Sequence, residues 1–336
     1  MQNTGKQCLA LCRLAWCKWY LGDHRAAQGH AYESQRLAKI SSDLFTEAKA
    51  LHVEAVCWTS LGNYQQSISL CNRARDLSSL CGLSGGELDH SIMILQAEVH
   101  RLKSEYGQAR IIHAHILQNV WLDQDPYKHA IALFNFAQID GQIDAPQDVV
   151  QRNLDRARAI FSDVEDLRMT SLTLSRKGDV QSAKTMFCKI VRESRGQDFD
   201  KVANCLERLG DVSCWGATNM SSWTTVFLAY SLKSKAQLEI HKALQFLGDV
   251  FLAHGDEDTA VSLFIVALDG FTSMDVHHSR AECMLQLGDI HGKHSDLLRA
   301  VELWQAAKPL FEWSSQAKWV DEISERLANT GKYVVR

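Results

Sequence analysis

Cysteine and histidine are the residue types in this sequence that are best suited to bind a metal or to act as a nucleophile, with ten and fourteen copies respectively. The two groups that come nearest to a site are Cys8, Cys12, Cys17, His24 and His30, and His277, His278, His291 and His294. Neither group has the C-x-x-C pairs that are typical of structural zinc sites. We therefore interpret the cysteines as small buried apolar residues and expect His277 and His278 to be exposed in a loop.

Sequence motifs for catalysis or nucleotide binding are also missing. The stretch LSGGE at Leu83–Glu87 is close to the signature loop of ABC-type ATPases, but the chain has no G-x-x-x-x-G-K-[ST] segment to hold phosphates. It has no G-x-S-x-G, H-E-x-x-H or G-x-G-x-x-G motif either. The sequence thus predicts a protein that is not an enzyme, with no catalytic residues, no metal and no cofactor.

Composition and charge further limit the class of protein to which this chain can belong. Among 336 residues there are only three prolines, which favours a mostly helical chain. The net charge of −4 offers no basic surface for nucleic acid, and the longest apolar run, near Ala260–Leu268, is too short to cross a membrane. The N-terminal stretch does not resemble a signal peptide. We expect a cytoplasmic protein with reduced thiols that binds neither nucleic acid nor membranes.

A turn-like motif recurs along nearly the whole chain. Similar short stretches are centred on Gly22, Gly62, Ser104, Gly141, Gly178, Ala217, Gly255 and Ser295, at intervals of 37 to 42 residues. Apolar residues recur three and four positions apart on both sides of each stretch, as in Leu244, Leu247 and Phe251. The period therefore predicts eight helical hairpins, each too small to bury both of its faces alone.

Small residues recur within each predicted hairpin. They lie seven residues before and five residues after the turn, most clearly at Ala15, Ala55, Ala97, Gly210, Gly248, Gly288, Ala27, Ala109, Ala183, Ala260 and Ala300. Two helices can approach closely only where small side chains lie at their crossing. We expect these positions to be structural, and larger residues such as Phe264 and Trp304 to fill the gaps between hairpins.

The outline L-G-D-x-x-x-x-x-G-D-x-x-x-A-x-x-x-F-x-x-A-L at Leu247–Leu268 resembles a tetratricopeptide repeat. That family has a norm of ~34 residues per repeat, so the chain resembles its long-repeat regulatory type, with repeats of about forty residues. The resemblance implies an all-α, right-handed superhelical solenoid of about eight hairpins with a C-terminal capping helix. It also implies a non-catalytic scaffold that binds another protein on its concave face.

The predicted domain is a single solenoid over residues 1–336. Its repeats are expected at about 8–40, 48–80, 89–121, 128–161, 165–195, 201–234, 241–273 and 281–313, with the capping helix at 315–330. In the fourth repeat we expect Pro146 in the first turn of a late-starting helix, with Asp144 as its cap. Because the first repeat starts almost at once, the chain is expected to be a fragment or to have lost an upstream domain.

The residue six before each turn centre should point towards the concave face. These positions include Trp16 near one end, and the acidic residues Asp211, Asp249 and Asp289 near the other. Together with Trp19, Glu207 and Glu282, they are our candidates for partner contact, and a basic or amphipathic helical segment is the predicted partner. Alternatively, the acidic residues only solvate the surface or bond to the next unit. Two further hypotheses are that the chain is the sensor end of a larger signalling ATPase or regulator whose N-terminal part is absent, and that it is an enzyme on a helical scaffold. The sequence leaves the partner's identity and the oligomeric state open.

Overall fold

The computed structural model describes residues 2–118, 125–143, 145–193, 205 and 220–334. Every regular element in these ranges is an α-helix, which confirms the all-α prediction. Three of the predicted positions, Glu207, Gly210 and Asp211, lie outside the described residues. The sixth predicted hairpin is therefore represented by its second helix, α12 (Met220–Ser234).

The chain divides into two compact units. The first unit comprises Met1–Arg101 and Gln108–Phe136, and the second comprises Leu102–Gly107 and Ala137–Arg336. That residues 1–336 form one continuous solenoid stays a prediction. Each unit is described by itself below.

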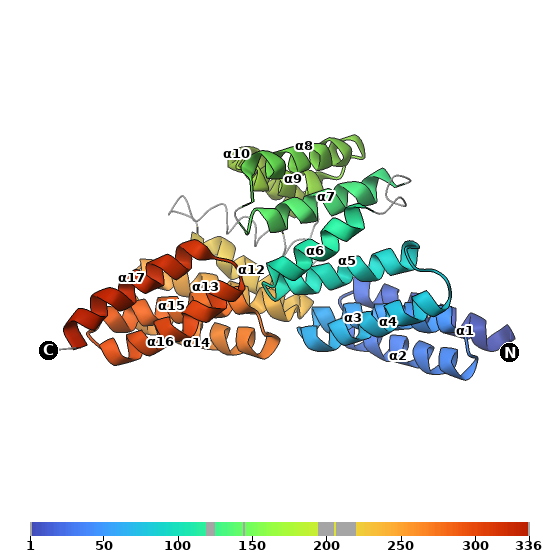
Figure 1. Ribbon diagram of the computed structural model, residues 1–336, viewed down its shortest axis with the longest axis horizontal. Coiled ribbons are helices and arrows are strands. Elements are labelled where there is room, and N and C mark those ends of the chain that lie inside the picture. The colour runs from blue at the N-terminus through green and yellow to red at the C-terminus, as the bar shows by residue number, and fades with distance from the viewer. Residues whose placement is uncertain (1, 119–124, 144, 194–204, 206–219, 335–336) are drawn as a thin grey trace. The chain divides into compact units, whose positions relative to one another are not determined.

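Helix pairs build the first unit. Its elements are α1 (Gln2–Tyr20), α2 (His24–Ile40), α3 (Leu44–Ser60), α4 (Tyr64–Leu80), most of α5 (Glu87–Leu102), most of α6 (Tyr106–Leu117) and most of α7 (Pro126–Asp140). Helix α1 packs against α2 and α3 against α4, while α2 also packs against α3 (Figure 1). The unit is thus made of antiparallel hairpins stacked one on the next, as the period predicts.

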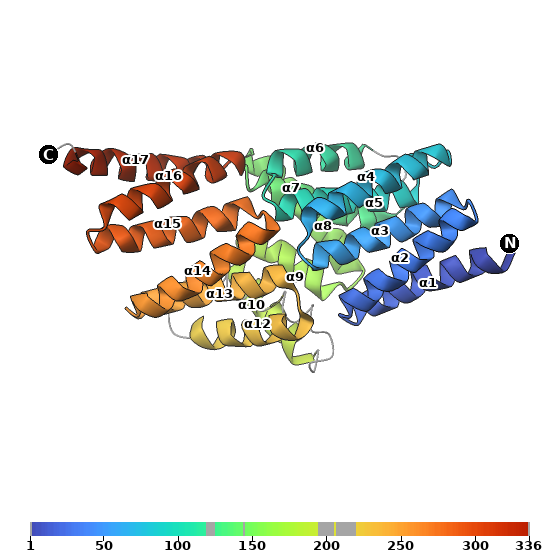
Figure 2. The ribbon, with the colours of Figure 1, turned by 90° about the horizontal axis from the view of Figure 1, so that it is seen from below.

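The second unit continues the same construction. Its helices are α8 (Gln147–Asp163), α9 (Leu167–Arg176), α10 (Val180–Glu193), α12, α13 (Gln237–Ala253), α14 (Glu257–Met274), α15 (His277–Lys293), α16 (Leu297–Trp313) and α17 (Ala317–Val334). From α12 to α17 each helix packs against the next along the chain (Figure 2). Helix α17 covers the last hairpin, at the position where the sequence predicts a capping helix.

The recurring turn has a simple physical basis. Gly22, Gly62, Gly178 and Gly255 have φ between 74° and 83°, a left-handed conformation that glycine adopts without strain. The residue that follows then caps the next helix: Asp23, for example, accepts from the amide N of Ala26, and Asp256 from that of Thr259. The Gly-Asp pair therefore ends one helix and starts its partner.

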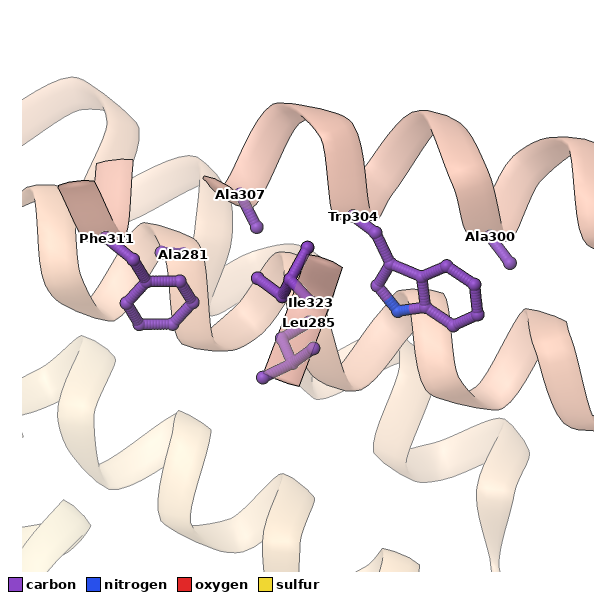
Figure 3. Close-up of a cluster of buried hydrophobic side chains, with 7 residues drawn as sticks. All are labelled: Ala281, Leu285, Ala300, Trp304, Ala307, Phe311 and Ile323. Carbon is purple, nitrogen blue, oxygen red and sulfur yellow. The ribbon is translucent and has the colours of Figure 1, made fainter. Parts of the chain in front are cut away.

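Small side chains lie at the helix crossings. Ala15, Ala27, Ala55, Ala97, Ala109, Ala183, Ala260 and Ala300 have no exposed surface, and Gly248 and Gly288 are also buried. Phe264 of α14 lies directly against Gly248, and Trp304 of α16 against Gly288. Figure 3 shows Ala300, Trp304 and Ala307 along one face of α16, on the side towards the helix that carries Leu285. Each large ring thus fills the space that a glycine leaves open.

Two local expectations are wrong. Pro146 is the N-cap of α8 and not part of its first turn, and it makes no side-chain capping bond because proline has no polar side-chain atom; Asp144 lies outside the described residues. His277 and His278 are not exposed in a loop. They begin α15, and their side chains are only 12% and 20% exposed, because Trp313 and Phe311 of α16 pack against them.

Candidate partner-binding surface

The described candidates for partner contact belong to two separate surfaces. Trp16 and Trp19 lie on α1 of the first unit. Asp249 lies on α13, and Glu282 and Asp289 on α15, all in the second unit. Since α13 and α15 are the first helices of successive hairpins, their equivalent faces present these carboxylates one repeat apart.

Asp289 is fully engaged within the chain. Its Oδ1 accepts from the indole Nε1 of Trp304 at 2.9 Å, and its two oxygens accept from Nε and an Nη of Arg326 at 2.9 and 3.1 Å. Arg326 comes from α17, so this bidentate pair ties the capping helix to α15. We infer that Asp289 serves primarily to hold the capping helix.

Glu282 is held by two neighbours on the same surface. Its Oε2 accepts from Nε2 of Gln245 on α13 at 3.0 Å, and its Oε1 lies 3.1 Å from Nε2 of His278. Burial pushes the pKa of Glu282 upwards, but His278 and Gln245 outweigh it and leave the pKa below its ordinary value. Burial likewise lowers the pKa of His278, but the charge of Glu282 reverses this and raises it. Each member of the pair therefore favours the charged form of the other.

Asp249 is the half-buried member of this cluster that has no partner in the described residues. Within the described part of the chain, its carboxylate accepts no hydrogen bond and has no cationic partner. Burial, and then the charge of Glu282, raises its pKa from 3.8 to about 7. A carboxylate in that state is poorly compensated, and a cation placed beside it would stabilise its charged form.

Asp249 and Asp289 occupy equivalent positions forty residues apart, and so do Phe264 and Trp304. The repeat thus places the same carboxylate twice, but the phenyl ring of Phe264 has no N–H to offer. The arginine that α17 supplies to Asp289 also has no counterpart at Asp249 among the described residues. Of these two equivalent carboxylates, Asp289 therefore binds an arginine from a neighbouring helix and Asp249 does not.

Trp16 and Trp19 have partly structural roles. Both pack against a buried cluster formed by Cys12, Ala15, Ala27, Ala31, Val53 and Cys57. Trp19 also donates its Nε1 hydrogen to Ser60 Oγ at 2.8 Å, which links α1 to α3. Trp16 stands edge-to-face on His52, with ring centroids 5.8 Å apart.

Sequence reasoning missed three residues that shape these surfaces. Gln245 and His278 stand four residues before Asp249 and Glu282 on their helices, so helical spacing was a usable signal for both. Arg326 gave no such signal, because its contact with Asp289 depends on how α17 docks. Within the described residues, no group of three His, Cys, Asp or Glu side chains could hold a metal, and no helix is long and apolar enough to cross a membrane.

Comparison with solved structures decides the fold. The crystal structure of a Rap protein complexed with competence and sporulation factor aligns with 98% of this chain and 99% of its own, at a TM-score of 0.61 and 13% identity. The alignment spans both units and includes the helical hairpins described above. The chain has the tetratricopeptide-repeat fold.

Other tetratricopeptide-like structures align more loosely. The apo form of RapI covers 91% of this chain and 98% of its own, with 11% identity and a TM-score of 0.44. A tetratricopeptide repeat protein from Parabacteroides merdae ATCC 43184 covers 83% and 99%, with 14% identity and a TM-score of 0.43. A scan against protein-family models and a search of curated protein sequences found no match. At these identities the likeness concerns the fold alone.

Proposed function

We propose that this protein is a non-catalytic interaction scaffold that binds a basic peptide or amphipathic helical segment of another protein. The proposed contact is the carboxylate pair of Asp249 and Glu282 on α13 and α15, on the surface expected to be concave. One observation carries the proposal: α17 places Arg326 on Asp289, the repeat equivalent of Asp249. A partner helix that presents arginine in the same way would satisfy Asp249.

Electrostatics supports a cationic occupant. Burial raises the pKa of Asp249, and like-charge repulsion from Glu282 adds to that rise. A guanidinium between the two carboxylates would replace repulsion by two charge-assisted hydrogen bonds. Such a contact sets orientation and docking rate, and apolar neighbours supply further affinity.

The comparison adds a parallel. The Rap protein that shares this fold was solved in complex with a bound factor, competence and sporulation factor. A solenoid of this kind can therefore hold another molecule, and we propose the same use here. Glu207 and Asp211, which lie outside the described residues, remain predicted members of the contact surface, and a cytoplasmic location stays a prediction.

Equilibrium binding tests the proposal. We expect the full chain to bind a fluorescein-labelled, 18-residue Leu/Arg amphipathic peptide more tightly than a matched peptide with every Arg replaced by Gln. The double variant Asp249→Asn/Glu282→Gln should weaken binding by at least about tenfold, or ~1.4 kcal/mol. Asp269→Asn is the matched control, because Asp269 is exposed on α14, away from this surface. Equal binding by the double variant and wild type would contradict the proposal.

The same assay has a predicted pH dependence. Because the pKa of Asp249 is about 7 in the free protein, most of the population is protonated at pH 6 and most of it is ionised at pH 8. A cationic peptide binds the ionised form, so its affinity should increase as pH rises from 6 to 8. The variant Asp249→Asn should remove most of this increase. An affinity that falls over the same range would show that the peptide does not bind beside Asp249.

A further inference from the structure

An aromatic face on α1 and α3 belongs to the first unit, whereas the acidic pair belongs to the second. We call it the aromatic–basic face, and its members are Arg13, Trp16, Tyr20, Phe45, Lys49 and His52. Three of its rings are neighbours: Trp16 lies 6.1 Å from Tyr20 and 5.8 Å from His52 between centroids. On α3, the Nζ of Lys49 stands 4.3 Å from the centroid of the Phe45 ring. Phe45, Lys49 and His52 stand four and three residues apart on α3 and therefore share one side of that helix.

The base of the face is fixed by buried contacts. Trp16 is anchored on the buried cluster around Ala15 and Val53, and the ring of His52 is buried and bonds to the backbone of Ser91 on α5. Aromatic rings held in this way lose little conformational freedom on binding. The outer members remain accessible, since Tyr20 is 75% exposed and Phe45 is also exposed. The face thus combines a rigid base with an open rim, which is the arrangement of interface anchors.

The cations on this face are not neutralised. Lys39 and Arg73, which belong to the same unit, both lie within 3.9 Å of Glu47. Among the described residues, by contrast, no carboxylate pairs with Arg13 or Lys49. Arg13 stands three residues before Trp16 on α1, and therefore on the same side of the helix. Lys49 reaches across to α1: burial raises the pKa of Cys12, and the Lys49 ammonium opposes that rise.

We propose that the aromatic–basic face docks an acidic segment of a partner protein, one that carries carboxylates beside aromatic or aliphatic side chains. The rings would take the apolar side chains, and Arg13 and Lys49 the carboxylates. The proposal involves other residues, and the opposite charge, from the basic-segment site on α13 and α15. The two can therefore succeed or fail independently.

Anisotropy titration of the full chain tests this docking site. The probe is a fluorescein-labelled, 18-residue amphipathic peptide of Glu, Leu and Phe, and its counterpart has every Glu replaced by Lys. We expect the acidic probe to bind more tightly than its counterpart. We also expect Lys49→Glu to weaken binding by at least tenfold and Tyr20→Ser to weaken it severalfold. Arg25→Glu, an exposed charge reversal on α2, and Asp249→Asn/Glu282→Gln should leave the affinity unchanged.

Three results would overturn the proposal. The first is equal or tighter binding of the lysine probe to wild-type protein. The second is an equal loss of affinity for Lys49→Glu and Arg25→Glu, which would reduce the effect to net charge. The third is a dimer of the chain that Lys49→Glu dissociates in the absence of probe, measured by sedimentation, which would assign the face to a second copy. Circular dichroism of each variant must match wild type, and Lys49→Gln provides a milder variant if Lys49→Glu does not fold.

Discussion

Replacing Gly248 by leucine should destabilise the second unit by roughly 3 kcal/mol or more, through overpacking. A Cβ added at this position would lie 2.7 Å from the ring of Phe264, which is fully buried and cannot move aside. The gain in helix propensity on removing glycine, up to about 1 kcal/mol, offsets only part of this. At about 2–4 °C per kcal/mol, the melting temperature of this unit should fall by roughly 6–12 °C.

A matched glycine gives the control for this prediction. Gly29 lies on the exposed side of α2, and a Cβ added there meets nothing within 4 Å. Gly29→Leu should therefore leave the melting temperature unchanged or raise it slightly. Adding Phe264→Leu to Gly248→Ala should restore part of the stability that Gly248→Ala removes. An unchanged melting temperature for Gly248→Leu would refute the proposed packing of α13 on α14.

The first unit should become less stable in acid, because this unit buries two neutral imidazoles. Burial lowers the pKa of both His52 and His113 from 6.5 to about 4, and His113 is only 1% exposed. For His52 the bond to the backbone of Ser91 opposes the shift; for His113, Glu98 opposes it while Arg101 and His90 add to it. The unfolded chain thus takes up protons from about pH 6.5 downwards, and the folded chain only near pH 4.

Stability from these histidines is therefore complete above pH 6.5 and is lost as the pH falls towards 4. A shift of about 2.5 pKa units corresponds to roughly 3 kcal/mol for each residue. The urea midpoint of unfolding should drop steeply between pH 7 and pH 5. The double variant His52→Leu/His113→Leu should show a much smaller drop, whereas His115→Gln, on the exposed side of α6, should behave like wild type. An equally steep drop in the double variant would exclude these residues as the cause.

The fold could be predicted from the sequence because the same turn and the same helix crossing recur in several repeats. Gly22, Gly62 and Gly255 mark turns that need a left-handed backbone, and the aspartate after two of them starts the next helix. The alanines at helix crossings recur because close approach excludes larger side chains. Each of these signals is local, so periodicity alone was enough to find it. The division into two compact units has no comparable local mark.

The candidate site could be predicted only in part from the sequence, because its contacts depend on tertiary packing. The sequence places Asp249 and Asp289 on equivalent faces but cannot distinguish them, because the distinction depends on Trp304 and on the docking of α17. It also cannot tell which acidic residue has a partner within the chain, as Glu282 has in His278 and Gln245. Tertiary partners decide which carboxylate remains open to another protein.

Hydrogen–deuterium exchange of the full chain, with and without the Leu/Arg peptide, tests the central claim most directly. If the protein holds a basic segment on Asp249 and Glu282, the amides of α13 around 242–249 and of α15 around 278–286 should exchange more slowly in the complex. The double variant Asp249→Asn/Glu282→Gln should lose this protection, and Asp269→Asn should keep it. Slowed exchange only on other helices, or the same protection in the double variant, would contradict the account.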